Sequence, residues 1–465
     1  MDAQEEKYMK MTTPPVEKLI CRLAAPCIVS MLVTSFYNMA DTYFVGMLKS
    51  NAATGAVGVV FSVMAVIQAI GFFFGQGSGN FISRELGKKN YDQASQMAAT
   101  GFVSALATGL VICILGQIFL EPLAVFLGST PTILPHTTAY LRVILYGAPW
   151  MCASFVLNNQ LRFQGSASYS MVGIVVGAVL NIILDPIMIF AMNLGVAGAG
   201  WATILSQLVS FCLLLGGTRR GGNIRMNLAN FRFSGFYFSW IFKGGLPSLA
   251  RQGLASVATI CLNNAAMGYG DAAIAAMSVV QRIAMFTVMP LVGVSIAIQP
   301  LLGFNYGAKI IARVRKTLWL GVAFATSLAV MMWALVHLFP NQIVGLFGIT
   351  NASLAEFTIF ALKVQLLMLP FVGFQIVGSN YFQATGQPMK STILSLTRQV
   401  LFLLPLMFWL PEVLPSWFSQ FTGLDALYIA TPVADFLAIF TVGIFIAIEM
   451  RRLKDVESGK ITSKY

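Results

Sequence analysis

Charged side chains are scarce in this chain. Only 10% of its 465 residues are Asp, Glu, Lys or Arg, whereas 57% are hydrophobic. A soluble globular domain carries about 25% charged residues, so the composition excludes that class and predicts an integral membrane protein. The net charge of +12 does not indicate a nucleic acid partner, because the basic residues occupy short loops and form no continuous stripe.

Histidine and paired cysteine are scarce as well. His136 and His337 are the only histidines and have no zinc-binding spacing, and the six cysteines include no C-x-x-C pair. The sequence has no H-E-x-x-H or G-x-S-x-G motif, which makes a membrane enzyme the weakest alternative. We therefore expect a protein that is not an enzyme and that has no cofactor.

Long apolar runs are abundant. Twelve of them are long enough to cross a bilayer, and we expect each to be a helix because the bilayer core offers free backbone groups no partner. None shows the alternation of a β-barrel strand. The runs cover residues 18–46, 52–80, 94–120, 135–160, 169–192, 196–216, 240–267, 272–300, 317–340, 354–382, 391–411 and 426–450.

The loops predict the orientation. Most Lys and Arg residues follow even-numbered segments, and the opposite loops carry few. The polar residues 1–18 lack the apolar core of a cleavable signal peptide. The positive-inside rule then places both termini in the cytoplasm.

The chain also repeats itself with a shift of 220 residues. NAATGAVGVV at 51–60 aligns with DAAIAAMSVV at 271–280, and the pair Gly128 and Thr130 aligns with Gly348 and Thr350. Six helices are an even number, so the two halves have the same orientation, related by a pseudo-two-fold axis normal to the membrane. The predicted fold is all-α, with twelve transmembrane helices in two six-helix lobes. The predicted parts are a cytoplasmic segment 1–17, an N-lobe 18–216, a basic linker 217–239, a C-lobe 240–450 and a cytoplasmic tail 451–465.

Two carboxylates lie inside apolar segments of the first half. Asp41 and Asp185 are in the first and fifth segments, at similar depth, and Thr203 in the sixth reaches the same level. Asn181 shares a helix face with Asp185, and Pro186 lacks the N–H that would pair with a carbonyl one turn earlier. A charge at a membrane helix centre costs about 2.5–3.5 kcal/mol and marks a functional site by default. These oxygen groups suit Na⁺ or H⁺; the structural alternative is a protonated Asp that hydrogen-bonds between helices.

Four sequence segments resemble the multidrug and toxic compound extrusion (MATE) transporters, in particular the DinF-like and MepA-like bacterial branch. They are YNMADTYFVG at 37–46, NIILDP at 181–186, GVAGAGWAT at 195–203 and QPLLGFNYGA at 299–308. The resemblance covers about 15–450. It implies a coupling-ion site in the N-lobe formed by Asp41, Asn181, Asp185 and Thr203 with the backbone near Ala199, and polar cavity groups at Tyr37, Tyr140 and Asn158.

The second half carries a different set of charges. Its seventh segment has no Asp or Glu and its tenth has only Glu356 near an edge, so we expect no cation site of the NorM-like type there. Arg282, Lys363, Arg398 and Asp435 lie within segments. They form either buried ion pairs or a path for substrate or protons.

Deformable and aromatic side chains suit varied hydrophobic cations. The candidates for a substrate cavity are Met31, Phe36, Met64, Gln281 and Arg282.

The sequence thus predicts a secondary active antiporter of the bacterial inner membrane. It would export amphipathic, mostly cationic small molecules in exchange for H⁺ or Na⁺, with Pro26 and Pro186 as hinges. We expect a monomer whose only other partner is membrane lipid. The alternative is a flippase for a lipid or lipid-linked glycan.

Overall fold

The computed structural model describes residues 3–267, 271–346 and 352–458, and within these ranges the secondary structure is helical. The prediction of an all-α chain is confirmed. In the first half the helices are α1 (Ala3–Thr12), α2 (Val16–Gly46), α3 (Asn51–Gly87), α4 (Tyr91–Ile118), α5 (Leu120–Phe126), α6 (Leu134–Phe163), α7 (Ala167–Pro186), the π-helix η1 (Ile187–Ala191), α8 (Gly195–Gly217) and the short 3₁₀ helix η2 (Leu228–Asn230).

The second half continues the helical pattern. Its elements are α9 (Gly235–Met267), α10 (Asp271–Gly307), α11 (Ile311–Leu338), α12 (Pro340–Gly345), α13 (Ala352–Gln365), α14 (Leu369–Ala384), α15 (Pro388–Leu396), the π-helix η3 (Thr397–Leu403), α16 (Leu404–Trp417) and α17 (Gly423–Glu457). Each of the twelve predicted segments falls on one of these helices or on two or three consecutive ones.

Ten helices of the described residues are long and apolar enough to cross a membrane, and an eleventh span results if α13 and α14 count as one. These two helices are bent by 44° at residues 366–368, where the sequence predicted one continuous segment. The predicted eleventh segment is likewise interrupted, by η3. The predicted seventh segment is α9, which is 33 residues long and is not among the ten.

The chain divides into two compact units. The first unit comprises Met1–Leu249 with Gly303–Lys309, and the second comprises Ala250–Leu302 with Ile310–Tyr465, so the division falls inside α9 and α10. The described residues of the predicted tail end at 458, and 459–465 lie outside them.

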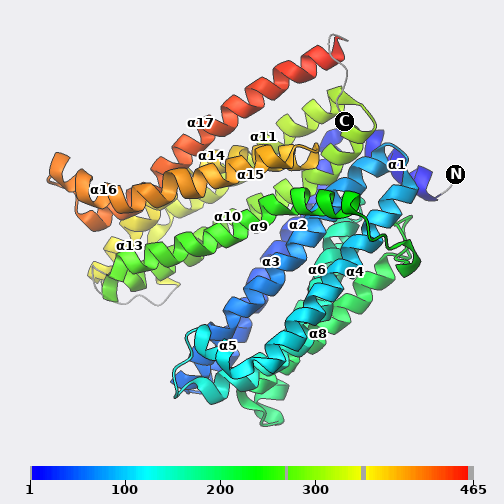
Figure 1. Cartoon of the computed structure of the whole chain (residues 1–465). Helices are drawn as coiled ribbons and strands as arrows, with labels where there is room; N and C mark the ends of the chain where they lie inside the picture. The colour runs from blue at the N-terminus through cyan, green and yellow to red at the C-terminus, as the bar shows by residue number, and fades with distance from the viewer. Residues whose placement is uncertain (1–2, 268–270, 347–351, 459–465) are drawn as a thin grey trace. The chain divides into compact units, whose positions relative to one another are not determined.

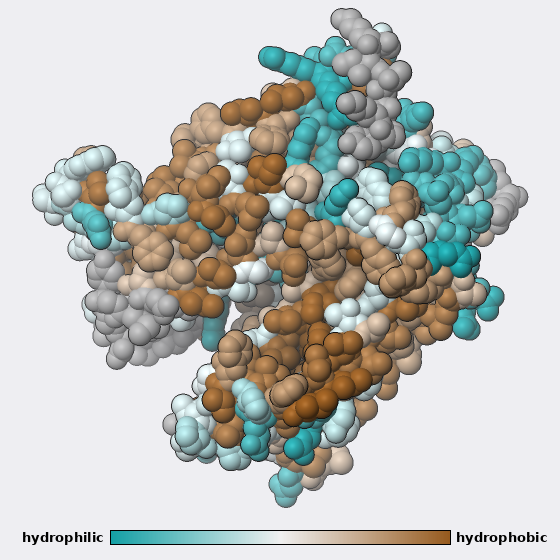
Figure 2. Space-filling view, viewed as in Figure 1, coloured by the Kyte–Doolittle hydropathy of each residue, from teal (hydrophilic) through white to brown (hydrophobic). Residues whose placement is uncertain are grey.

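The first unit is built around α6. This helix packs against α3, α4 and α8, while α2 packs along α7 and α7 along α8; Figure 1 shows α3, α4, α6 and α8 running side by side. In α6, 72% of the apolar window is buried, compared with 28% for α3. The helix at the centre of the unit is therefore α6, and the outer helices present their apolar faces outward. Figure 2 shows hydrophobic side chains along this unit and hydrophilic ones gathered at the end that carries α1.

The second unit has its own core. There α11 packs against α14, and α17 against α16 and α14. Its buried side chains include Met277, Leu362 and Tyr428.

Local backbone geometry follows the sequence repeat. Lys89 and Lys309, 220 residues apart, adopt left-handed conformations with φ of 60° and 59°. Gly165 and Gly386 do the same with φ of 78° and 81°. The two halves therefore share their turns as well as their helix order. Gly348 and Thr350, which the sequence aligned with Gly128 and Thr130, lie outside the described residues.

Candidate cation site

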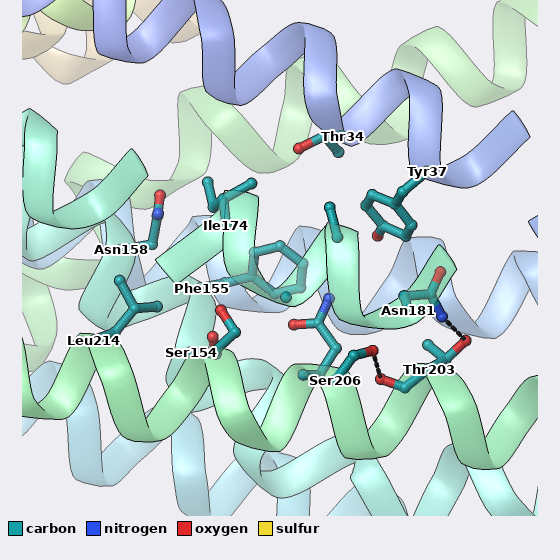
Figure 3. A pocket seen from close by; sticks show the side chains of 14 residues that line it. Thr34, Tyr37, Ser154, Phe155, Asn158, Ile174, Asn181, Thr203, Ser206 and Leu214 are labelled. Atoms are coloured by element: carbon teal, nitrogen blue, oxygen red, sulfur yellow. Dashed lines mark hydrogen bonds between the residues drawn. The ribbon is translucent and has the colours of Figure 1, made fainter. Parts of the chain in front are cut away.

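The first unit brings three of the predicted site residues into direct contact. Asn181 and Asp185 lie one turn apart on α7, and Thr203 faces them from α8. The Asn181 amide nitrogen is 3.5 Å from Asp185 Oδ1 and 3.4 Å from Thr203 Oγ1. Thr203 Oγ1 in turn donates to the carbonyl of Ala199 at 3.0 Å. The amide thus joins a carboxylate on one helix to a hydroxyl on the next. Figure 3 shows the bond between Asn181 and Thr203.

Asp41 reaches the same site from α2. Its carboxylate interacts electrostatically with that of Asp185, and the Tyr140 hydroxyl on α6 interacts with both carboxylates. Tyr37, one turn before Asp41 on α2, interacts with Asp41 as well. The sequence predicted a common depth for the two acids, and the packing of α2 along α7 supplies the lateral proximity.

Burial leaves several of these oxygens without a partner. Asp185 is fully buried and Asp41 is 9% exposed. Within the described residues, Asp41 Oδ1, Asn181 Oδ1 and Asp185 Oδ2 accept no hydrogen bond. Buried polar atoms are paired in nearly all native proteins, so three neighbouring orphan oxygens mark a candidate ligand site. An all-oxygen set with two carboxylates fits H⁺ or a hard monovalent cation such as Na⁺ as a transported ion. The described residues contain no cluster of three His, Cys, Asp or Glu side chains that would hold a tightly bound metal.

Local sequence explains how α7 and α8 approach so closely at the site. Pro186 ends the regular part of α7, and the π-helix η1 follows directly. Short π-helical segments of this kind occur often at functional sites. A Cβ atom on Gly198 would lie 2.6 Å from the carbonyl oxygen of Met188 in η1. Only glycine therefore permits this contact, which places Ala199 and Thr203 beside Asn181.

A narrow cavity of about 40 Å³ adjoins the site. This volume accommodates at least one water molecule. Tyr37, Asn158, Asn181 and Thr203, all predicted from the sequence, contribute to its wall (Figure 3). Other polar lining residues were not predicted from the sequence. Ser206, Gln207 and Ser210 follow Thr203 on α8, while Thr34 comes from α2 and Ser154 from α6.

The other predicted cavity residues of the first half do not line this cavity. Tyr140 is fully buried, and its hydroxyl is 3.9 Å from the sulfur of Met64. Met31 and Phe36 are not among the lining residues, and Phe36 is 58% exposed. Pro26 lies inside α2, where its carbonyl accepts a hydrogen bond from Ser30 at 2.8 Å.

The four charges predicted within segments of the second half separate into one ion pair and two cations without an ion pair among the described residues. Arg398 Nε is 2.7 Å from Asp435 Oδ1, and the Asp435 side chain is 5% exposed. Lys363 and Arg282 form no ion pair with any described residue. Arg282 is exposed on α10 beside Gln281. The prediction that Gln281 and Arg282 line a substrate cavity stays a prediction. The embedded charges thus do not form one network.

Comparison with known proteins gives a family-level match in both halves. A family model described as MatE matches residues 26–187 and again 247–409, together more than two thirds of the chain. The two matches begin 221 residues apart, which agrees with the internal repeat.

Individual relatives align over nearly the whole chain. The "Multidrug export protein MepA" of Staphylococcus haemolyticus (strain JCSC1435) is 27% identical over 440 residues, covering 94% of this chain and 96% of the relative. The protein of that name from Staphylococcus aureus (strain NCTC 8325 / PS 47) is 27% identical over 419 residues, covering 89% and 92%. A solved structure described as the outward-facing conformation of a multidrug resistance MATE family transporter of the MOP superfamily has a TM-score of 0.88 at 27% identity, covering 96% of this chain and 98% of that one.

Proposed function

The chain belongs to the MatE family, and from this premise we propose that it is a secondary active multidrug efflux transporter. It exports amphipathic, mostly cationic compounds in exchange for H⁺ or Na⁺ that binds at Asp41 and Asp185. The names of its relatives, multidrug export proteins of two staphylococci, support this assignment.

The observation that carries the proposal is the pair of buried carboxylates with unpartnered oxygens. Asp41 Oδ1, Asn181 Oδ1 and Asp185 Oδ2 have no partner among the described residues, and Thr203 adds a hydroxyl oxygen within reach. A purely structural acid in this position would satisfy its oxygens through neighbouring donors. Ion binding supplies the missing partner, and ion release restores the unsatisfied state.

The ion acts by favouring one conformation over another. Occupation of the carboxylate pair draws α2 toward α7 and bends α2 at Pro26, whose ring removes one backbone hydrogen bond. Pro186 provides a second break where α7 meets η1. One elementary charge moving across 100 mV supplies about 2.3 kcal/mol, enough for a roughly fifty-fold drug gradient.

The location follows from the charge distribution. Arg219, Arg220 and Arg225 lie in the loop after α8, at the end of the first unit that also carries α1. The positive-inside rule places this end, and with it both termini, in the cytoplasm of a bacterial inner membrane. In this proposal the transporter works as a monomer.

Efflux of ethidium from membrane vesicles tests the proposal, with pH and Na⁺ gradients imposed separately. We expect Asp41→Asn and Asp185→Asn each to reduce gradient-driven efflux to background at wild-type protein levels. Their amides keep the shape of the side chains but neither take up a proton nor hold a negative charge.

Glu121→Gln is the matched control, since it neutralises an exposed acid on α5 and should leave efflux unchanged. Wild-type efflux by either Asp variant would contradict the proposed site. If neither gradient drives efflux in the wild type, while deletion of the protein impairs envelope synthesis, the flippase alternative replaces the drug antiporter.

A further inference from the structure

A second and larger cavity lies in the first unit, away from the carboxylates. Its volume is about 530 Å³. It is enclosed by α1, the first turns of α2, the turn between α6 and α7, and the loop after α8. The lining residues are Ala3, Glu6, Lys7, Lys10, Met11, Leu19, Arg22, Leu23, Gly165, Ser166, Ser168, Tyr169, Gly221 and Gly222.

The charged side chains of this lining are mostly basic. Lys7, Lys10 and Arg22 face a single acid, Glu6, and that acid is already paired with Lys10 at 2.6 Å. Arg22 forms no ion pair or side-chain hydrogen bond with any described residue. The cavity therefore carries net positive charge that the protein itself does not neutralise.

Lys7 is the unusual member of this set because it is buried. Its side chain is 9% exposed, and its ammonium group donates to Ser166 Oγ at 2.9 Å and to Asn223 Oδ1. Both acceptors are neutral, so the buried cation has hydrogen bonds but no counter-ion within the described residues. Burial, and to a smaller extent the neighbouring Lys10, lowers the pKa of Lys7 to about 7. A buried, uncompensated cation in a cavity wall favours an anionic ligand.

The remaining wall indicates what carries the anion. Met11, Leu19 and Leu23 give the cavity an apolar side next to its basic rim. Two membrane-spanning helices, α2 and α7, begin at this cavity, which places it at the level of the membrane interface. The amino terminus of α7, at Ser166 and Ser168, adds positive potential. An anionic group beside an apolar surface at this depth is the chemistry of a phospholipid.

We propose that this cavity binds the phosphate headgroup of an anionic phospholipid of the cytoplasmic leaflet. Lys7, Lys10 and Arg22 hold the phosphate, and the apolar wall contacts the start of an acyl chain. Basic pockets between membrane helices at the cytoplasmic side bind such headgroups in other membrane proteins. The bound lipid would fasten α1 to α2 and α7.

The test uses the purified full-length protein, titrated with phosphatidylglycerol or phosphatidylcholine and followed by native mass spectrometry. We expect tight binding of one phosphatidylglycerol and at least five-fold weaker binding of phosphatidylcholine. Arg22→Gln should weaken phosphatidylglycerol binding about five-fold, the value for one basic residue at a membrane surface. Lys7→Met should weaken it at least as much.

Arg219→Gln is the matched control, because Arg219 is an exposed arginine after α8 that does not line the cavity. The proposal is overturned if this variant loses as much affinity as Arg22→Gln, or if the wild type binds both lipids equally. A third arm adds inorganic phosphate at millimolar concentration. If phosphate displaces phosphatidylglycerol completely, the cavity is a small-anion site and the lipid assignment is wrong. If Lys7→Met detaches α1, Arg22→Gln still decides the question, because Arg22 supports no described contact.

Discussion

Thr203 is the residue of the candidate site that can be substituted without changing the charge of the site. Its hydroxyl joins the amide of Asn181 to the carbonyl of Ala199, so it orients the amide that faces Asp185. The hydroxyl is neutral, and its loss changes the oxygen set without changing charge.

We expect Thr203→Val to weaken coupling-ion affinity by about two- to thirteen-fold, because one hydrogen bond or ligand contact contributes about 0.5–1.5 kcal/mol. The measurement is the concentration of H⁺ or Na⁺ that gives half-maximal ethidium efflux. Thr203→Ser keeps the oxygen and should stay within two-fold of the wild type. An unchanged midpoint in Thr203→Val would remove Thr203 from the site.

The sequence was sufficient to predict which residues form the site, but not that their side chains are in contact. Counting residues along a helix gives depth, so Asp41, Asp185 and Thr203 could be placed at one level. Their lateral approach depends on which helices pack together and on how each is rotated, and neither follows from counting. Ser206 and Ser210 were missed because small hydroxyls in an apolar helix also serve as ordinary packing residues.

At the scale of single elements, we expect the docking of α1 to respond to pH. Lys7 anchors it to Ser166 and Asn223, and Lys10, Glu6 and Arg22 are the charged groups that face the same cavity. Burial in the docked helix lowers the pKa of Lys7 to about 7, whereas its ordinary value is near 10.4. Between these two pH values Lys7 is therefore protonated when α1 is undocked and mostly neutral when α1 is docked.

Docking of α1 should therefore strengthen as pH rises from about 7 toward 10, by at most ten-fold per pH unit, and be weakest below pH 7. A spin label at Gln4→Cys reports docking through its mobility, measured in detergent without lipid. Lys7→Met should abolish the pH dependence. The same titration curve in Lys7→Met would show that another group is responsible.

Sequence patterns did not predict where individual helices bend or change their hydrogen-bonding pattern. Each of the twelve apolar segments predicted from hydropathy falls on helical structure, although only ten spans, or eleven with α13 and α14 as one, are long and apolar enough to cross a membrane among the described residues. Hydropathy did not reveal the 44° bend between α13 and α14, because apolar residues continue through the break and Pro370 fits both arrangements. The π-helices η1 and η3 differ from α-helix by a shifted hydrogen bond, which leaves no trace in composition. Residues 3–12 were predicted only as a polar segment, although they form α1.

For the whole molecule, the distribution of Lys and Arg predicts both termini on the cytoplasmic side. Fusions of green fluorescent protein and of alkaline phosphatase to each terminus test this orientation in bacterial cells. We expect fluorescence and no phosphatase activity from both ends. Phosphatase activity at either terminus would contradict the orientation and would also move the Lys7 cavity away from the cytoplasmic leaflet.

The two units use charge differently although they share a helix pattern. The first holds two acids with unpartnered oxygens, Asp41 and Asp185. In the second, Asp435 is already paired with Arg398 at 2.7 Å. An acid held in an ion pair gains little from a second cation, so we assign ion coupling to the first unit alone.

The left-handed lysines at 89 and 309 have a consequence for the history of the chain. A non-glycine residue in this conformation costs about 1–2 kcal/mol, and here that cost recurs at the same register 220 residues apart. Two independent origins of one unfavourable turn are improbable compared with a single inheritance. The shared lysine turn is what duplication of one ancestral segment would leave in both halves, and the acid pair distinguishes the amino-terminal half.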